Sequence, residues 1–386
     1  MRKVLGFRGS GVLGVVLLVL ALTLAAPWAP VAAQQAAAPV DAAAALPAKL
    51  SDAAFWKLVS DISEPGGYFR IVDNFTSNER EIGPIFTMIR QSGPHGGVYM
   101  GVGPEQNFTY IAAVRPAMAF VVDIRRQAVM QHLMSKAIFE MAPDRAEFIS
   151  LQFAKPRPIG LTHATPIQQT WESFFAVPTD RDMAAKTYAR IVERLTQIHK
   201  FTFTEEESGL LDKVYQAFIA YGPNITTQSG GRGGGNALTF ADLTGWTADT
   251  SGQPQSFLST DDNYQYVRAL QEKNLVVPVS GDFGGPKTIR AIGTYLRERG
   301  ANVSAFYVSN VEQYLYMESG KARAFYDNVA TLPLTDASVF IRAYSLRQRY
   351  GQDGALCPVN LYLAAVKEGR MLTNNESLAC AVGPRR

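Results

Sequence analysis

The hydrophobic and polar positions along this chain follow two periods, one typical of strands and one of helices. Short apolar runs predict buried strands at 98–100, 119–122, 275–279 and 303–308, with later strands at 339–344 and 361–366. Apolar residues at helical spacing predict helices at 51–62, 108–114, 128–141, 144–154, 184–198, 205–221, 262–273 and 286–299, and one that ends near 90. Strands that alternate with helices are typical of an α/β fold, with a mainly parallel sheet and helices on both faces.

The segment 96–127 carries the most specific local pattern. A strand leads into a turn with Gly101 and Gly103, Asn107 can cap the helix that follows, and the next strand ends on Asp123. Nucleotide-binding βαβ units have the same order of elements, namely a strand, a glycine turn, a helix, a second strand and an acid. The glycines let backbone N–H groups approach a ligand, and an acid about 20 residues further on accepts hydrogen bonds from ribose hydroxyls. The pattern therefore predicts a ligand site.

The same pattern has a purely structural interpretation. A glycine turn between a strand and a helix is common in α/β proteins, and Asp123 can instead cap a turn or pair with Arg125 or Arg126. In this interpretation Asp123 stabilises the fold and contacts no ligand.

Polar residues also follow two later strands. Asp282 comes after the strand at 275–279, and Asn310 comes after the strand at 303–308. The carboxyl ends of parallel strands meet at one edge of a sheet, where ligands bind in such folds. We therefore expect Asp282 and Asn310 to lie near Gly101 and Asp123. Further carboxylates can converge there, so that the candidate cluster contains Asp73, Glu79, Asp123, Asp282 and Glu312.

The first residues predict export. Basic residues precede an apolar run at 11–26, and small residues precede Gln34. This is the pattern of a secretory signal peptide at 1–33, and its apolar run is short for a stable membrane span. Cleavage leaves a periplasmic or secreted protein with no stable membrane span, whereas an uncleaved leader leaves an N-terminal membrane anchor. Residues 34–50, rich in Ala and Pro, are expected to form a disordered linker.

Charge excludes one class of partner. The whole chain has 37 Lys and Arg against 34 Asp and Glu, and the predicted leader holds only bases, so the rest of the chain is formally neutral. Nothing here indicates a nucleic-acid partner. Residues 51–386 are long enough for one large domain, with a helical insertion at about 128–222 that can cover the ligand edge of the sheet. A flexible Gly-rich loop is expected at 228–236, and it lacks the Gly-Lys-Ser/Thr ending of a phosphate loop.

The chain contains two cysteines, Cys357 and Cys380. In an exported chain an even number favours a disulfide bond, and the alternative is a pair of free buried thiols. The four histidines show no metal-ligand spacing, so no metal site is expected. A Gly-x-Ser-x-Gly nucleophile elbow does not occur in the sequence.

Four strings carry a resemblance to a known family, namely GVGPEQNFTYIAAVRP, FVVDIRRQ, VPVSGDFGGPK and AFYVSNVEQYL. Here the chain resembles a family of uncharacterised bacterial proteins whose fold is similar to class I S-adenosylmethionine-dependent methyltransferases. The resemblance implies a Rossmann-like domain. It matches Gly101 and Gly103 to the glycine turn of the cofactor motif, and Asp123 to the acid that holds the ribose. It also places Asp282 where methyltransferases often have substrate or catalytic groups, and it makes S-adenosylmethionine a candidate cofactor.

Two positions depart from the methyltransferase pattern. Tyr99 stands where the family usually has an acid, and Glu105 stands at the third glycine of the motif. An exported methyltransferase would also lack an obvious supply of a cytoplasmic cofactor. These three features favour a binding protein over an enzyme.

The sequence therefore supports three functional hypotheses. The favoured one is an exported protein that binds a small nucleoside-type ligand at the unit from Gly101 to Asp123. The first alternative is an active S-adenosylmethionine-dependent methyltransferase, in which Asp282 or Glu79 acts at the substrate. The second alternative is a structural or interaction protein without a small ligand. The residues expected to contact a ligand are Gly101, Gly103, Glu105, Asn107, Asp123, Asp282 and Asn310.

Overall fold

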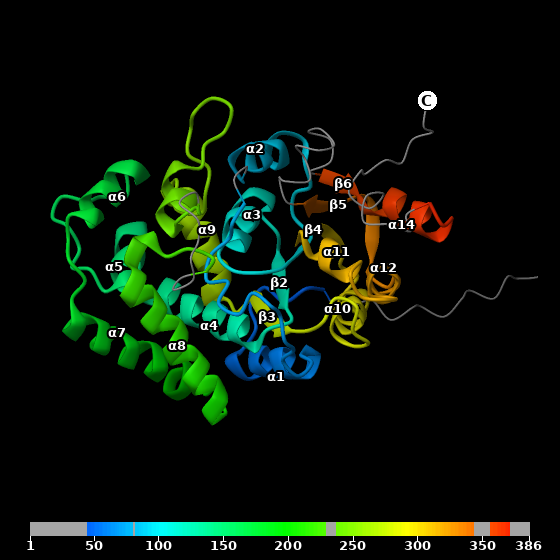
Figure 1. The fold of residues 1–386 in the computed structure, drawn as a ribbon, viewed down its shortest axis with the longest axis horizontal. Helices are drawn as coiled ribbons and strands as arrows, with labels where there is room; N and C mark the ends of the chain where they lie inside the picture. Colours follow the sequence, from blue (N-terminus) through cyan, green and yellow to red (C-terminus); the bar gives the residue numbers. More distant parts are fainter. Residues whose placement is uncertain (1–44, 80–81, 229–236, 343–355, 371–386) are drawn as a thin grey trace, which may run out of the picture. The chain divides into compact units, whose positions relative to one another are not determined.

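The computed structural model of the protein describes residues 45–79, 82–228, 237–342 and 356–370. These residues form a six-stranded, mainly parallel sheet flanked by helices, which confirms the predicted Rossmann-like α/β fold class (Figure 1). The predicted leader, most of the predicted linker, nearly all of the Gly-rich loop and Cys380 lie outside the described residues.

The sheet brings together apolar runs that are far apart in the sequence. Its strands are β1 (Val98–Gly101), β2 (Met118–Asp123), β3 (Val276–Ser280), β4 (Val303–Ser309), β5 (Leu334–Arg342) and β6 (Leu356–Pro358). Their spatial order is β3-β2-β1-β4-β5-β6, in which β6 is antiparallel to β5 and all other neighbours are parallel. The chain moves from β1 outward to β3 and returns to the other side of β1 with β4. The direction of winding therefore reverses between β1 and β4, which is the topological switch point of the sheet.

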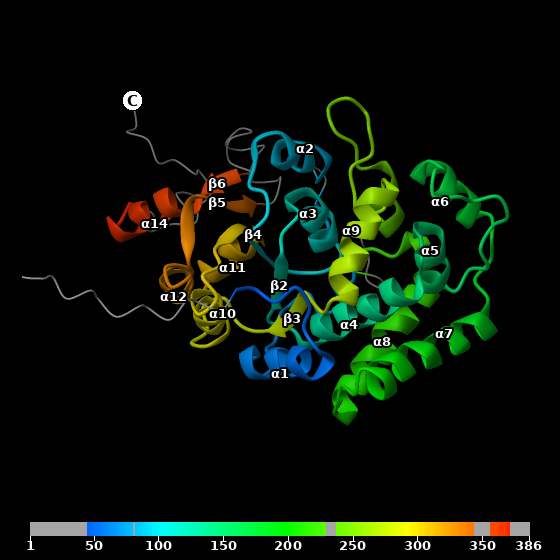
Figure 2. The same ribbon diagram turned by 180° about the vertical axis from the view of Figure 1, so that it is seen from behind.

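Helices cover both faces of the sheet (Figures 1 and 2). Because crossovers between parallel strands are almost always right-handed, this strand order assigns the helices between β1 and β3 to one face and α10, which follows β3, to the other. On the first face α3 (Gln106–Val114) and α4 (Arg126–Met141) pack with α9 (Asp261–Glu272), and on the second face α1 (Asp52–Ile62) packs with α10 (Thr288–Arg297). The remaining helices are α2 (Ile82–Ser92), α5 (Arg145–Phe153), α6 (Ile167–Phe175), α7 (Arg181–Glu193), α8 (Glu205–Tyr221), α11 (Val311–Leu315), α12 (Lys321–Val329) and α14 (Val359–Lys367), with shorter helical turns η1 (Arg194–Ile198), η2 (Gly222–Asn224) and η3 (Asp242–Trp246).

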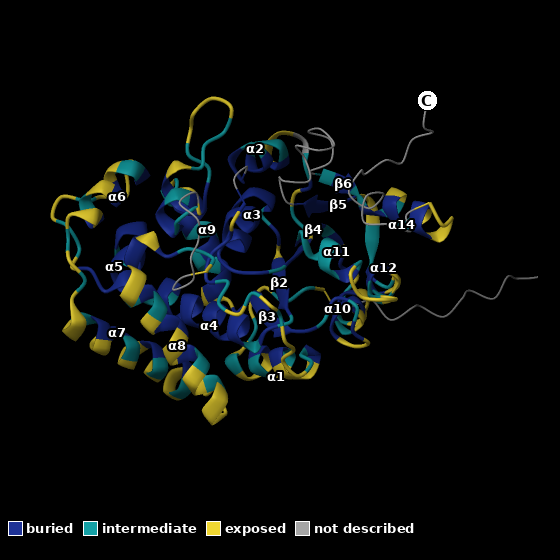
Figure 3. Ribbon diagram, viewed as in Figure 1, coloured by how far each residue is buried: buried dark blue, intermediate teal, exposed yellow. Residues whose placement is uncertain are grey.

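Burial follows these layers. Strands β1, β2 and β3 are buried along their whole length, because helices cover both of their faces. Every residue of α3 and most of α4 are buried, and α4 lies between the sheet and the helices α7 and α8, whose outer faces are exposed (Figure 3). A strand with no solvent-facing side is expected to have a nearly continuous apolar sequence. This accounts for the short apolar runs that predicted the strands.

Some local predictions differ from the structure. The run at 361–366 lies in α14 and not in a strand. A short apolar run cannot be assigned by periodicity alone, because a buried helix and a buried strand produce the same pattern. The pattern also gave no signal for α6 or α12. Ser51 caps the first helix, because its side chain accepts a hydrogen bond from the Ala54 N–H at 3.2 Å.

A partly buried group of charges connects α1, α4 and the residue that follows η1. Nδ1 of His199 lies 2.8 Å from Asp52 Oδ1, and its Nε2 lies 2.7 Å from Glu140 Oε2. Lys136 donates to the other Glu140 oxygen at 2.7 Å. Burial alone would lower the pKa of His199, but the hydrogen bonds and charge of Glu140 and the hydrogen bond of Asp52 outweigh it, so that the pKa is raised. At a pH below this raised pKa, a protonated imidazole links two carboxylates on different helices.

We expect the free energy of unfolding to decrease as the pH rises above about 6.5. The folded protein holds the His199 proton more tightly than the unfolded chain does. The stability that His199 contributes is therefore fully present at a pH below its pKa in the unfolded chain. It is lost as the pH rises through the raised pKa of His199 in the folded protein. Urea unfolding across neutral pH measures the slope, and His199→Gln should flatten it. An equal slope in the His199→Gln protein would assign the effect to another group.

Candidate functional site

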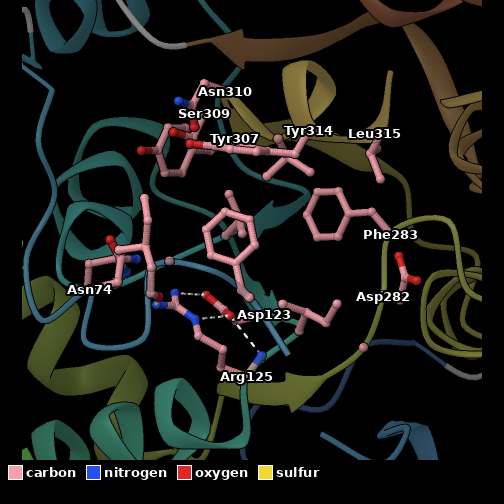
Figure 4. Close-up of a pocket in the computed structure, with 18 of the residues that line it drawn as sticks. Asn74, Asp123, Arg125, Asp282, Phe283, Tyr307, Ser309, Asn310, Tyr314 and Leu315 are labelled. Carbon is pink, nitrogen blue, oxygen red and sulfur yellow. Dashed lines mark hydrogen bonds and ion pairs between the residues drawn. The ribbon is translucent and has the colours of Figure 1, made fainter. Parts of the chain in front are cut away.

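A cavity of about 270 Å³ opens at the carboxyl ends of the four parallel strands β1 to β4, and we call it the strand-end cavity. Gly103 after β1, Asp123 on β2, Asp282 after β3 and Ser309 on β4 all line it. Figure 4 shows the last three of these side chains around the cavity. Residues of the segment 68–78 and of α11 form its sides. The cavity lies at the switch point, where the crossovers from β1 and β4 leave in opposite directions. Ligands bind in this crevice in open α/β sheets.

The turn after β1 is shaped from inside by Asn107. The side-chain amide of Asn107 donates to three carbonyls at 2.8–3.0 Å, those of Val102, Gly103 and Pro104. Its Oδ1 accepts a hydrogen bond from the Tyr99 hydroxyl at 3.0 Å. The predicted N-cap role of Asn107 is wrong, because α3 begins one residue earlier and Asn107 lies within it. Its side chain instead lies inside the turn and donates hydrogen bonds to the carbonyls of the turn.

The two glycines of this turn are required for different reasons. A Cβ at Gly101 would clash with Asn107 Oδ1 and the Tyr99 hydroxyl, so this glycine allows close packing inside the protein. Gly103 has a φ of +80°, a conformation that other residues rarely adopt, and only Gly103 of the pair lines the cavity. Its carbonyl also lies 2.8 Å from Nε2 of His132, and burial lowers the pKa of this histidine. A neutral imidazole thus donates to the turn from α4.

Glu105 points away from the strand-end cavity. The N–H of Ser77 lies 3.0 and 3.2 Å from its two carboxyl oxygens. Burial raises the pKa of Glu105 to about 8, so this side chain carries a proton at neutral pH. Its contact with Ser77 connects the turn after β1 to the segment 68–78.

Asp123 forms a two-point ion pair with Arg125 (Figure 4). Its Oδ1 accepts from the Arg125 backbone N–H at 2.9 Å and from Nε at 3.0 Å, and Oδ2 accepts from Nη2 at 2.8 Å. The side chain of Asp123 is only 5% exposed, and that of Arg125 is 9% exposed. Arg125 also donates to the Ile71 carbonyl at 3.1 Å, which connects β2 to the segment 68–78. The pairing expected from the structural interpretation is therefore present, and Asp123 lines the cavity as well.

Asp282 and Asn310 reach the cavity from the two strands that precede them. Asp282 forms an ion pair with Lys321 at the start of α12, and its Oδ1 accepts from the Gly284 N–H at 2.9 Å. Figure 4 places Asp282 on one side of the cavity and Asn310 on another. The strand-end rule thus brings Gly103, Asp123, Asp282 and Asn310 together, whereas Gly101, Glu105 and Asn107 lie behind the wall.

A buried carboxyl group lies next to the end of β4. Oε1 of Glu79 accepts hydrogen bonds from the Tyr307 hydroxyl at 2.6 Å and from Ser309 Oγ at 2.5 Å. Both donors line the cavity, whereas Glu79 does not. Its Oε2 is buried and has no hydrogen-bond partner within the described ranges, and burial raises the pKa of Glu79. Ser309 has a φ of +49°, so a strained backbone presents its hydroxyl to this carboxyl group.

Aromatic side chains form the outer wall. The rings of Phe69 and Tyr314 meet edge to face, with their centroids 4.8 Å apart. The guanidinium of Arg70 lies 4.8 Å from the centroid of the Tyr314 ring. Tyr68 is 81% exposed at the cavity. Apolar ring surfaces therefore lie opposite polar strand ends, a composition typical of small-molecule sites.

Two expectations about this edge of the sheet are wrong. The helices α4 to α8 fill the connection between β2 and β3, but they pack on one another and contribute no described residue to the cavity wall. The candidate carboxylate cluster is also incomplete. Asp73 Oδ1 lies 3.3 Å from Lys213 Nζ, and Glu312 Oε2 lies 2.7 Å from Arg342 Nε in a buried ion pair. Neither of these two acids lines the cavity.

Sequence reasoning missed the aromatic wall and the two hydroxyl groups of β4. Tyr307 and Ser309 are two residues apart at the end of β4, the spacing that places side chains on one side of a regular strand. The register of β4 with β5 shifts between these two residues, yet both hydroxyl groups reach Glu79. This spacing was available as a signal. Phe69 and Tyr314 are far apart in the sequence, and no local pattern connects them.

The described residues provide no group of three His, Cys, Asp or Glu side chains that could hold a metal ion. In the same part of the chain, no helix combines the length and the apolar character that a membrane crossing requires.

The fold and the cavity define a Rossmann-like α/β protein with a site of small-molecule size at the switch point. The chain belongs to the family described as Domain of unknown function (DUF7790), whose model matches residues 74–202 and 244–369. No curated protein matches the sequence. The family description names neither an activity nor a methyltransferase, so function has to be argued from the site.

Asp123→Ala should lower the free energy of unfolding by about 3–5 kcal/mol, because it leaves Arg125 buried without its carboxylate. Urea denaturation measures the change. Asp61→Ala is the matched control, since Asp61 pairs with Lys57 at the surface, where both side chains are more than half exposed. The control should change stability by less than about 1 kcal/mol. Equal losses in the two variants would show that the buried pair does not stabilise the fold.

Proposed function

We propose that the protein is exported and binds a small nucleoside-type ligand in the strand-end cavity. The observation that carries the proposal is the position of this cavity at the switch point of a parallel sheet. Its volume of about 270 Å³ is near the lower end of ligand sites, which favours a ligand no larger than a nucleoside. The rings of Phe69 and Tyr314 offer surfaces on which a flat base can pack.

The charges around the cavity favour a nucleoside over a nucleotide. The two basic side chains among its lining residues, Arg125 and Lys321, are each paired with a carboxylate. A phosphate group usually requires unpaired basic side chains or a helix N-terminus directed at it. The wall supplies polar groups that suit hydroxyl groups better than a doubly charged phosphate.

Asp123 is the residue we assign to the ribose. A carboxylate has about four lone-pair positions, and Arg125 uses three of them. Oδ2 therefore keeps one free position for a ligand hydroxyl. Arg125 orients the carboxylate and leaves this position open, so the ion pair and the ribose role are compatible.

Methyl transfer from S-adenosylmethionine is a second candidate function. It is favoured by Glu79, a buried carboxyl group of raised pKa that is connected to the cavity through Tyr307 and Ser309. Such groups are common among general acids and bases. Asp282, on the cavity wall, is the other candidate for a catalytic role.

Export and a disulfide bond between Cys357 and Cys380 are part of the proposal. The leader pattern at 1–33 and the even number of cysteines support them. Intact-mass measurement of unreduced protein from its native host should find an N-terminus near Gln34 and the loss of two hydrogen atoms. A protein that keeps Met1 would contradict export, and an unchanged hydrogen count would contradict the disulfide bond.

A thermal-shift screen of the full chain against nucleosides and S-adenosyl compounds tests the ligand class. Titration calorimetry then compares the wild type with Asp123→Asn, which keeps the side-chain size. Loss of a charged hydrogen bond should weaken nucleoside binding about ten- to a hundredfold. Asp61→Asn, on the surface of α1, should bind as the wild type does.

The outcomes separate the candidate functions. Nucleoside binding without turnover supports the binding protein, and transfer of a methyl group from S-adenosylmethionine supports the enzyme. Unchanged binding by Asp123→Asn would exclude the ribose role. No stabilisation by any compound would favour a structural or interaction protein.

A further inference from the structure

The hydroxyl groups at the end of β4 have their hydrogens committed before a ligand arrives. The Tyr307 hydroxyl and Ser309 Oγ both donate to the same atom, Oε1 of Glu79, at 2.6 and 2.5 Å. Each hydroxyl has one hydrogen to donate and two lone pairs that accept. Toward the cavity, both groups are therefore left as acceptors. A proton on Glu79 does not change this arrangement if it resides on Oε2.

The surroundings of Glu79 add a preference for a positive donor. This side chain is 6% exposed, and within the described residues its carboxyl group accepts hydrogen bonds from Tyr307 and Ser309, both uncharged. Its Oε2 has no partner among the residues described. The nearby acid Glu105 and the buried Tyr99 and Tyr110 add no positive charge. A buried carboxyl group without a cationic partner is unfavourable when ionised, so a cation nearby would stabilise it.

We infer that the strand-end cavity recognises an amino group of its ligand, preferably an ammonium group, which donates hydrogen bonds to the Tyr307 and Ser309 oxygens. This inference rests on the proposed function of the cavity and adds the polarity of one ligand group. Glu79 is a positioning residue, because it directs the two hydroxyl hydrogens away from the ligand. A carboxylate or phosphate at the same place would meet only acceptors.

Backbone strain at the same point supports a recognition role. Ser309 is one of a few non-glycine residues with a positive φ among the described residues, and Asn74, across the cavity, is another. Strained residues persist where the surrounding structure imposes them, and they cluster at ligand sites. At Ser309 the strained backbone places Oγ within reach of Glu79, so that two residues of one strand share one acceptor.

Three matched probes test which ligand group the Tyr307 and Ser309 oxygens prefer. Phenethylamine, phenethyl alcohol and hydrocinnamate share a phenyl ring and a short arm, and they end in an ammonium, a hydroxyl and a carboxylate group. Titration of the full chain followed by ligand-observed NMR should give at least about tenfold tighter binding of the amine than of the alcohol. The carboxylate should bind weakest.

Variants then test whether the preference for the amine comes from the hydroxyl groups of Tyr307 and Ser309. Tyr307→Phe and Ser309→Ala should each reduce the amine preference to a few-fold, while binding of the alcohol changes less. Tyr326→Phe is the matched control, because its hydroxyl also donates to a buried glutamate, Glu312, at 2.8 Å, but it does not line this cavity. The control should keep the full amine preference. Melting temperatures of all variants identify any loss of folding.

Several results would overturn the inference. These are equal or tighter binding of hydrocinnamate, an amine preference that survives in both Tyr307→Phe and Ser309→Ala, and failure of all three probes to bind. The nucleoside screen reports on the proposed function separately. Nucleoside binding together with any of these results removes the amino-group inference and leaves the proposed function intact.

Discussion

The site depends above all on the hydrogen bonds of one buried amide, that of Asn107. By donating to the carbonyls of the turn after β1 and accepting from Tyr99, it determines the path of the chain between β1 and α3. Gly101 must lack a Cβ for this side chain to fit. His132 holds the same turn from α4. The turn is therefore held by hydrogen bonds from within the protein, and it presents Gly103 to the cavity.

The segment 68–78 depends on other parts of the protein for its position. It contains no regular helix or strand, yet it supplies one wall of the cavity. Arg125 donates to its Ile71 carbonyl, Gln131 donates to its Phe75 carbonyl at 2.7 Å, and Glu105 accepts from its Ser77 N–H. These contacts come from the N-cap residue of α4, from α4 itself and from the turn after β1. A wall held by side chains of the scaffold can keep its shape without hydrogen bonds of its own.

Electrostatic pairing gives the cavity its chemical character. The acids at the ends of β2 and β3 have their own cations, Arg125 and Lys321, so they are oriented and largely neutralised. Glu79 differs, because it is buried and, within the described ranges, its carboxyl group accepts hydrogen bonds from hydroxyl groups only. Selectivity in such a site comes from the direction of hydrogen bonds more than from net charge. The same hydroxyl groups can serve ligand binding or proton transfer, which is why the fold alone does not decide between a binding protein and an enzyme.

The sequence by itself determined the fold class and four of the cavity positions, Gly103, Asp123, Asp282 and Asn310. It did so because apolar runs buried on both faces mark parallel strands, and polar residues that follow them must lie at one edge. Tertiary structure decided the rest. It determined that Asp123 pairs with Arg125 while lining a cavity, that Asn107 turns inward, and that the helices between β2 and β3 leave this edge open. These features arise from contacts between segments far apart in the chain, and such contacts depend on three-dimensional packing that local periodicity does not encode.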